Sequence, residues 1–457
     1  MPVGMVIARS APRPSPVEPR VPAAAAEATA RPASAPAVRA AVANDAGPEA
    51  PARRATPTSA SDARRAAQAL DGLRRVQLFA RADALDPKTK AGEPSPVAQV
   101  PGTDGGARTR AQALAEVEAH FVGSTGSAGV IGGTVKDYRD VTTPADAETT
   151  RLLAANQPLA DQARARLSPA DQARYDDLQA NLSSDARAQL ALQTMLIDGR
   201  LPGQPALRGT TTDTARTQPL DLLGQLDLMS RAPTASGLGG AAELLATTVK
   251  EVAFPQAINQ GPKGTCTVTA TGTTLALQHP AEYARVVMGL ASPSGAVTMA
   301  NGDTLTREGN TLADDGSGRT VTQRLLGPAL MEYGNGFLDY DSERDRSALV
   351  LPGLNNGGTA AVASALFGRE FESYQTLTTG LGLGYSNANN LIEAFDAGKQ
   401  PILFSANFPD SGHALLLRNV EVVDGTTYVT FQNPWGQEER VSYEELSARI
   451  TGVMQPR

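Results

Sequence analysis

The sequence predicts an α+β fold, in which a mostly helical region is followed by a second region that ends in antiparallel strands. Over residues 66–230, apolar side chains recur at intervals of three and four, which is the spacing of amphipathic helices. Asp424 and Gly425 lie between two strand-like runs and predict a turn that joins antiparallel neighbours. The strand-like runs cover 401–408, 413–423, 426–431 and 438–443.

Composition and charge argue against several classes of protein. A chain of 457 residues has room for two or three domains. The net charge of -7, with no stripe rich in Lys and Arg, argues against a nucleic-acid partner. A single cysteine excludes an internal disulfide framework. We expect no membrane span, because no apolar run reaches the necessary length of about 18 residues.

Residues 1–65 are biased toward Ala, Pro, Arg and Ser, and we expect them to be a disordered leader or tail. The apolar core of a classical signal peptide is not found there. A linker or tail is the interpretation that composition favours. The alternative is an uncleaved secretion leader, of the kind borne by bacterial effectors that a needle-type apparatus exports toward host proteins. Without such export the chain would be cytoplasmic.

Residues 66–230 should hold several helices. Periodicity predicts helices over 66–82, 107–121 and 145–155. Ser168-Pro169 predicts the start of another helix, with the hydroxyl as cap and Pro at the first helical position. Ser184-Asp185 begins one more, which should end near Ile197. Three roles stay open for this region: an inhibitor lying across a cleft like a propeptide, a module that recognises a partner, and a passive scaffold.

Residues 231–249 are predicted to be a linker, because 232–240 is rich in turn-forming residues, and 250–457 to be a second domain. Within that domain Asn301-Gly302 predicts a type I′ hairpin between the short apolar runs 296–299 and 304–306. Helices are expected over 267–278, 321–333 and 389–397.

Three scarce residue types stand in this second domain in the order expected for a thiol hydrolase. Cys266 is the only cysteine, His413 is one of three histidines, and Asn433 is followed by Pro434 and the only tryptophan, Trp435. Taken singly, each residue has an ordinary structural explanation as part of a packed core. Their conjunction in one order favours a catalytic triad.

The chemistry of a thiol nucleophile needs each of these types. Cys266 at the start of the helix 267–278 should have a lowered pKa, because the positive end of the helix dipole favours the thiolate. His413 can take the thiol proton and deliver it to the leaving group. Asn433 can hold the imidazole in its productive tautomer. Gln260 can place its side-chain amide beside the backbone N–H of Cys266 as an oxyanion hole.

The segments Gln260-Gly261-Pro262-Lys263-Gly264-Thr265-Cys266, Gly412-His413-Ala414 and Asn433-Pro434-Trp435-Gly436 resemble the papain-like cysteine peptidases, and the last leans toward the calpain branch. The resemblance implies a two-lobed fold for 250–457, with a Cys-bearing helix lobe and an antiparallel β lobe.

It also implies that Trp435 shields the contact between His413 and Asn433. By the same resemblance, Gly357 and Gly358 would bind substrate backbone. Thr265 and Thr267 depart from the family pattern. These departures weaken the resemblance to calpain and leave open which residues form the walls of the S′ side of the cleft. Calcium dependence does not carry over, because no acidic cluster has the spacing of an EF-hand.

The sequence therefore predicts a cysteine peptidase that acts on a protein or peptide substrate, with no cofactor and no metal. Alternatives with the same constellation are a glutamine deamidase, a transglutaminase and a deubiquitinase-like enzyme. A third class is an inactive binding module with the same fold. Substrate preference and oligomeric state are left open by the sequence.

Overall fold

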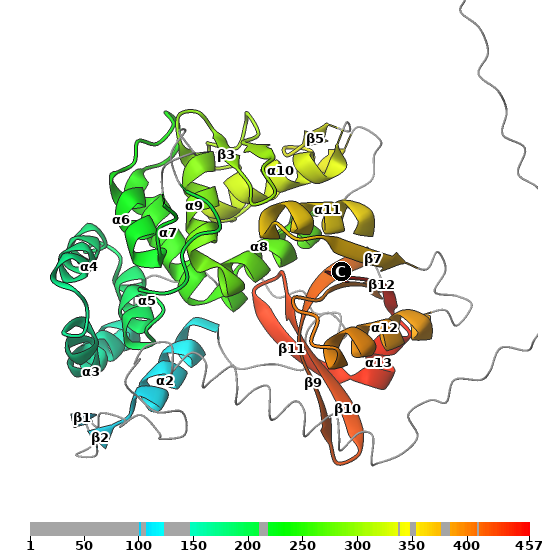
Figure 1. Ribbon diagram of the computed structural model, residues 1–457, viewed down its shortest axis with the longest axis horizontal. Coiled ribbons are helices and arrows are strands. Elements are labelled where there is room, and N and C mark those ends of the chain that lie inside the picture. The colour runs from blue at the N-terminus through cyan, green and yellow to red at the C-terminus, as the bar shows by residue number, and fades with distance from the viewer. Residues whose placement is uncertain are drawn as a thin grey trace, which may run out of the picture. The chain divides into compact units, whose positions relative to one another are not determined.

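The computed structural model describes residues 100–101, 107–122, 147–209, 218–336, 339–347, 353–375, 384–408 and 411–457. Helices and antiparallel sheets both build it, so the predicted α+β class is confirmed (Figure 1). The predicted tail 1–65 and the predicted helix 66–82 lie outside the described residues. A short antiparallel pair, β1 (Val100–Pro101) and β2 (Ala107–Arg108), precedes the first described helix.

The first helices occur where the sequence predicts them. Ser168 caps one of them by accepting a hydrogen bond from the Asp171 N–H at 3.2 Å, and Pro169 is its first residue. Asp185 caps the next by accepting from the Ala188 N–H at 2.9 Å. The four helices are α2 (Arg110–Val122), α3 (Ala147–Arg164), α4 (Pro169–Asn181) and α5 (Ala186–Ile197).

The predicted linker 231–249 is wrong over its second half. Helix α6 (Leu222–Arg231) ends where the linker was expected to begin, but α7 (Ala241–Ala253) crosses the predicted domain boundary. The buried side chains of α7 include Leu244, Leu245, Val249 and Val252, and they belong to a core that continues on both sides of that boundary. The helical region and the second region therefore share one hydrophobic core, because α7 packs between them.

The helix that begins at Cys266 lies at the centre of the fold. Helix α8 (Cys266–Gln278) contacts α9 (Pro280–Ala291), α10 (Val321–Asn335) and α11 (Asn356–Phe367), and it contacts the large sheet as well (Figure 1). Most of its side chains are buried, and apart from Leu275 they are small: Thr, Ala, Val, Gly and Cys. Small side chains allow neighbouring elements to approach a central helix closely, so α8 can touch helices and a strand at once.

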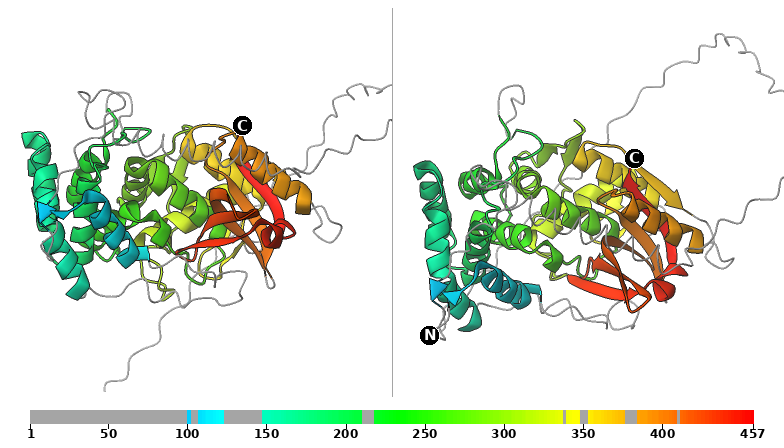
Figure 2. Two further views of the ribbon diagram at one scale, coloured as in Figure 1. Left: turned by 90° about the horizontal axis from the view of Figure 1, so that it is seen from below. Right: turned by 60° about the horizontal axis from the view of Figure 1, so that its bottom comes forward.

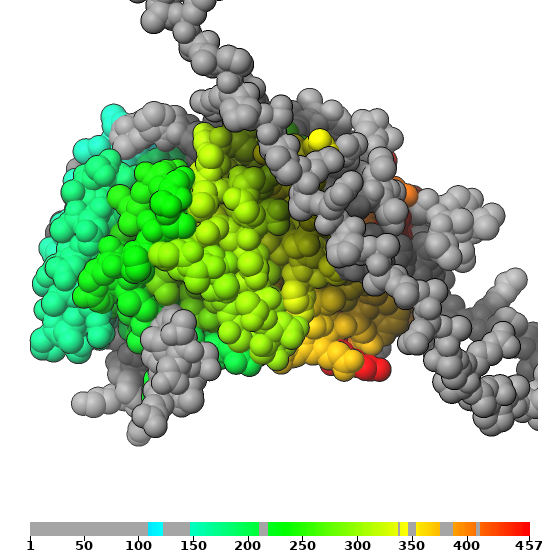
Figure 3. All heavy atoms as spheres, turned by 90° about the horizontal axis from the view of Figure 1, so that it is seen from above, coloured from blue at the N-terminus to red at the C-terminus, as the bar shows by residue number. Residues whose placement is uncertain are grey.

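The hairpin at Asn301-Gly302 forms, but not with the predicted type I′ turn. Strands β3 (Ala296–Thr298) and β4 (Thr304–Thr306) pair antiparallel, as expected. A type I′ turn needs positive φ at both central residues, and here Gly302 (φ 103°) has it whereas Asn301 does not. The Asn301 N–H instead donates to the carbonyl of Ala365 at 3.1 Å, so a tertiary contact sets the loop. In the space-filling view, the yellow-green part of the chain, to which this hairpin belongs, covers the middle of the face shown (Figure 3).

The large antiparallel sheet has six strands in the order β11-β10-β9-β8-β12-β7. Its two-residue turn at Asp424 (φ 49°) and Gly425 (φ 80°) joins β9 to β10 and has the positive φ values of type I′. The C-terminal strand inserts between β8 and β7, and neither it nor β7 was expected from the sequence. The strands are β7 (Phe371–Gln375), β8 (Leu403–Phe408), β9 (Ser411–Val423), β10 (Thr426–Asn433), β11 (Gln437–Ser442) and β12 (Ile450–Pro456).

Both faces of this sheet are covered. Helices α12 (Gly384–Asp396) and α13 (Tyr443–Ser447) lie beside one face (Figure 2). With this face they form a second core, to which Leu415 and Leu417 of β9 contribute. Leu416, between them, points to the other face and joins the core that contains α8 and α11. Because side chains alternate along a strand, β9 contributes to both cores, and the strand also contacts α8. Two short strands, β5 (Tyr340–Asp341) and β6 (Arg346–Ser347), and the 3-10 turn η3 (Pro255–Ala257) complete the described elements.

Candidate active site

Cys266 is the first residue of α8, where the backbone N–H groups have no partner within the helix. The backbone N–H groups of Ala414 and Thr267 lie near enough to its sulfur to favour the thiolate. Ala414 directly follows His413 on β9, so this contact places the thiol beside the strand that carries the imidazole. The cysteine side chain is almost fully buried, with 9% of its surface exposed.

His413 and Asn433 meet across the β9–β10 pair, as the sequence predicted. The Nε2 atom of His413 lies 2.8 Å from Oδ1 of Asn433, and both side chains are buried. A register shift between Thr430 and Phe431 lies just before the end of β10, where Asn433 is the last residue. The Trp435 ring lies over the imidazole with 4.5 Å between ring centroids. The indole ring thus packs against the imidazole.

Cys266 and His413 line one cavity of about 480 Å³. Its wall also includes Gln260, Thr267, Asp345 and Trp435, so it collects residues from α8, from the strands β8 and β9, and from several loops. The other two histidines lie elsewhere: His120 bonds the Thr149 hydroxyl, and His279 packs against the Phe367 ring. His413 is therefore the imidazole that shares a cavity with the thiol.

Burial controls the charge of both groups in this cavity. Burial raises the pKa of the Cys266 thiol, although backbone N–H groups act in the opposite direction, and the Asp345 carboxylate raises it further. Burial also lowers the pKa of His413 from 6.5 to about 4, against the opposing effect of its bond to Asn433. Burial therefore opposes the lowering of the thiol pKa that was expected from the helix dipole, and it favours the uncharged forms of both groups.

Gln260 lies in the same wall and links two of the matching segments. Its backbone N–H donates to the carbonyl of Pro434 at 2.8 Å, which joins the loop before Cys266 to the turn after Asn433. Its side-chain Nε2 donates to the Lys263 carbonyl at 2.6 Å. A second Nε2 hydrogen remains on this amide, so Gln260 keeps a donor of the type that the oxyanion hole requires.

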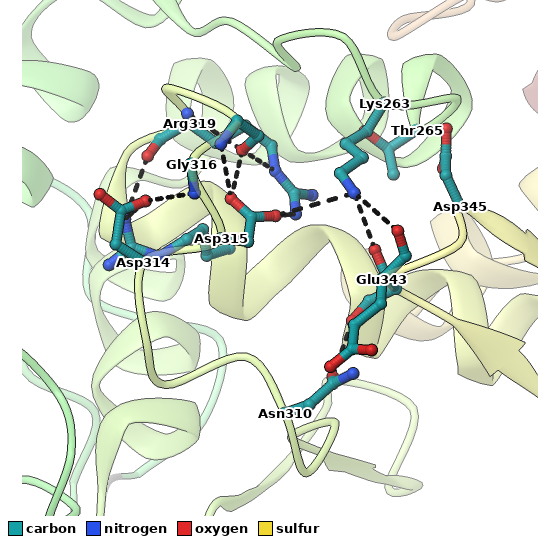
Figure 4. A network of polar contacts seen from close by, with 12 residues as sticks. Lys263, Thr265, Asn310, Asp314, Asp315, Gly316, Arg319, Glu343 and Asp345 are labelled. Atoms are coloured by element: carbon teal, nitrogen blue, oxygen red, sulfur yellow. Dashed lines mark hydrogen bonds and ion pairs between the residues drawn. The ribbon is translucent and has the colours of Figure 1, made fainter.

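An ammonium group holds the loop that precedes the nucleophile. Lys263 Nζ donates to the carbonyls of Ser342 at 3.0 Å and Glu343 at 3.3 Å, and lies 3.9 Å from Asp315 Oδ2 (Figure 4). Asp345 in the same loop accepts from the Gly264 N–H at 2.6 Å. The loops 314–319 and 341–345 are thus fastened to the segment 260–265, which forms one wall of the cavity.

Gly357 and Gly358 are not among the residues that line the cavity. Both lie in the first turn of α11, and a Cβ on Gly358 would meet the Gly334 carbonyl oxygen at 2.9 Å, so close packing against α10 accounts for this glycine. Gly353, which the sequence did not single out, does line the cavity and has a φ of 82°. Its positive φ is the reason for glycine at this position.

The sequence analysis assigned no role to three residues around the site: Lys263, Asp345 and Glu439. Glu439 accepts a hydrogen bond from Nδ2 of Asn433 at 2.6 Å. Lys263 and Asp345 make contacts between segments that are far apart in the sequence. No local sequence pattern predicts such contacts. Glu439 follows closely after the Asn-Pro-Trp-Gly segment, and this proximity along a hairpin was the one available signal.

Among the residues that the structure describes, no group of three or more His, Cys, Asp or Glu side chains could hold a metal ion. No helix in the described part of the chain is both long and apolar enough to cross a membrane. No family model and no curated protein matches the chain.

Proposed function

We propose that the chain is a cysteine peptidase of papain-like architecture, which hydrolyses peptide bonds through a thiol acyl-enzyme. The observation that carries the proposal is the surroundings of His413: its Nε2 lies 2.8 Å from Asn433 Oδ1, and it lines one cavity with Cys266. These two observations support a Cys-His-Asn arrangement with Cys266 as nucleophile, His413 as base and Asn433 as orienting amide.

In the proposed first step, Nδ1 of His413 takes the proton of the Cys266 thiol as the sulfur attacks the carbonyl carbon of the substrate. The carbonyl oxygen becomes an oxyanion, which the Cys266 backbone N–H and the Gln260 side-chain amide stabilise. The tetrahedral intermediate then expels the amine, and His413 returns the proton to the leaving nitrogen. Because burial favours the uncharged thiol and imidazole, the proton passes from the sulfur to Nδ1 as the bond to the carbonyl carbon forms.

The second step restores the enzyme. His413 takes a proton from a water molecule, whose oxygen attacks the thioester carbon of the acyl-enzyme. The carbon–sulfur bond breaks, the carboxylic acid leaves, and the proton returns to the Cys266 sulfur. No redox partner or further co-reactant is needed, since water supplies both the nucleophile and the proton.

The shape of the cavity wall favours an extended peptide as substrate. Gly261, Gly353 and Gly412 all line it, and none has a side chain that would keep a substrate main chain away. Leu354 provides an apolar contact in the same wall. A main chain that approaches closely and an apolar side chain are what peptide binding in a cleft requires.

The test is to incubate the protein, and its Cys266→Ala variant, with a mixture of cellular proteins and to map new N-termini by mass spectrometry. New termini with the wild type and none with Cys266→Ala or His413→Ala, both remaining folded by circular dichroism, are expected. Deamidated or cross-linked glutamine without new termini would replace the peptidase proposal by the transferase or deamidase alternative. No modification of any protein by wild type would favour the inactive binding module.

A further inference from the structure

A buried carboxylate lies directly behind the Asn433 amide. Glu439 is on β11, two residues beyond Gln437, which pairs with Asn433 where β10 and β11 meet at the turn. Only 2% of its surface is exposed. Its Oε1 accepts hydrogen bonds from Asn433 Nδ2 at 2.6 Å and from Gln437 Nε2 at 3.0 Å.

The neighbours of Asn433 allow only one orientation of its amide. The Trp435 N–H donates to Oδ1 at 3.1 Å, so that end must be the acceptor. The Glu439 oxygen at the other end requires a donor, which Nδ2 supplies. A flipped amide would set its NH₂ group against the Trp435 N–H and its oxygen against a carboxylate oxygen. Both contacts would be lost at once in a buried place, which is costly.

This orientation fixes the tautomer of the imidazole. Because Asn433 Oδ1 is an acceptor, the His413 Nε2 that lies 2.8 Å away must carry a hydrogen and donate. In a neutral imidazole the other nitrogen then has no hydrogen, so Nδ1 is the basic atom.

We propose that Glu439 is a positioning residue, which holds His413 through Asn433 in the tautomer with a basic Nδ1. The site would then contain a chain of four groups: thiol, imidazole, amide and carboxylate. This inference rests on the proposed function, since a tautomer matters here only if His413 is the base for Cys266.

The test measures how fast a peptidyl epoxysuccinate, which alkylates activated thiols, inactivates Cys266 in a series of variants. Glu439→Met fills a similar volume but leaves Asn433 Nδ2 without an acceptor, and should slow inactivation about tenfold or more. Glu439→Gln keeps an oxygen acceptor without the charge and should lose less than Glu439→Met. In an Asn433→Ala background neither change should alter the rate more than about twofold, because the intermediary is gone.

The matched control is Glu438→Gln, which removes the same charge one residue away. Glu438 forms an ion pair with Arg418 at 3.6 Å and is outside the cavity lining, so its rate should stay within about twofold of wild type. Thermal melting shows which variants fold. Should Glu439→Met fail to fold, the comparison of Glu439→Gln in the two backgrounds gives the answer.

Two results would overturn the inference while leaving the proposed function in place. One is a wild-type rate in both Glu439 variants, and the other is an equal loss with and without Asn433, which indicates a purely structural effect. Failure of the proposed function looks different: His413→Ala would then react as fast as wild type, whatever the Glu439 variants do.

Discussion

Acid should destabilise this protein through His413 in particular. The imidazole is buried, and its pKa falls from 6.5 to about 4 on folding. Between these two values the unfolded chain binds a proton at His413 and the folded chain does not. Stability contributed by the neutral imidazole is therefore present above pH 6.5 and is lost as the pH falls through this window.

The size of the effect follows from the pKa difference. One pKa unit corresponds to 1.36 kcal/mol, so a fall from 6.5 to about 4 removes about 3 kcal/mol from the free energy of unfolding. Other groups contribute to the pH dependence as well. Burial raises the pKa of Glu251, for example, and this acts in the opposite direction, because the folded protein then binds the proton more tightly.

The assay is urea unfolding of wild type and His413→Gln at several pH values from 7 to 4. Subtracting the two free energies at each pH cancels the contribution of Glu251 and of other shared groups. Glutamine keeps an amide that can donate to Asn433 but does not titrate. The advantage of wild type over the variant should shrink by about 3 kcal/mol between pH 7 and pH 4. A difference that stays constant across this range would refute the buried, neutral imidazole.

Three further substitutions test the walls of the site. Asn433→Ala should lower kcat/KM about 10- to 100-fold. This loss should be smaller than that of His413→Ala, because the Trp435 ring still holds the imidazole. A loss as complete as that of Cys266→Ala would contradict this. Lys263→Met should reduce the free energy of unfolding by about 1–2 kcal/mol in urea titrations and lower turnover, since two carbonyls lose their ammonium donor; unchanged values would show that the network in Figure 4 is dispensable. Gly353→Ala should cost about 1–2 kcal/mol at its φ of 82° and raise KM, and an unaltered KM would place Gly353 outside the substrate path.

The triad residues could be predicted from the sequence because each is scarce and stands in a local pattern. The single cysteine at a helix start, a histidine at the start of a strand and an asparagine at a turn are visible without coordinates. Glu439 is one of 48 acidic residues, and its importance comes only from the β10–β11 register, which places it behind Asn433. Lys263 likewise could not be recognised from the sequence, because its partners Asp315 and Ser342 lie in loops more than 40 positions further along the chain.

Long-range packing explains where the prediction of the fold was wrong. The stretch 231–249 has the composition of a linker at its start, but the leucines of α7 find partners in helices on both sides. Strand β12 was missed because it pairs with β7 and β8, from far earlier in the chain. Burial of the Cys266 thiol is of the same kind: the helix dipole can be inferred locally, whereas the elements that enclose the sulfur cannot.

The central claim is that His413 activates Cys266, and the rate of inactivation by a peptidyl epoxysuccinate tests it most directly. Since Cys266 is the only cysteine, any thiol adduct reports on this residue alone. We expect His413→Ala to react at least about 100-fold more slowly than wild type while both remain folded, as loss of a general base requires. Equal rates for the two proteins would contradict the account.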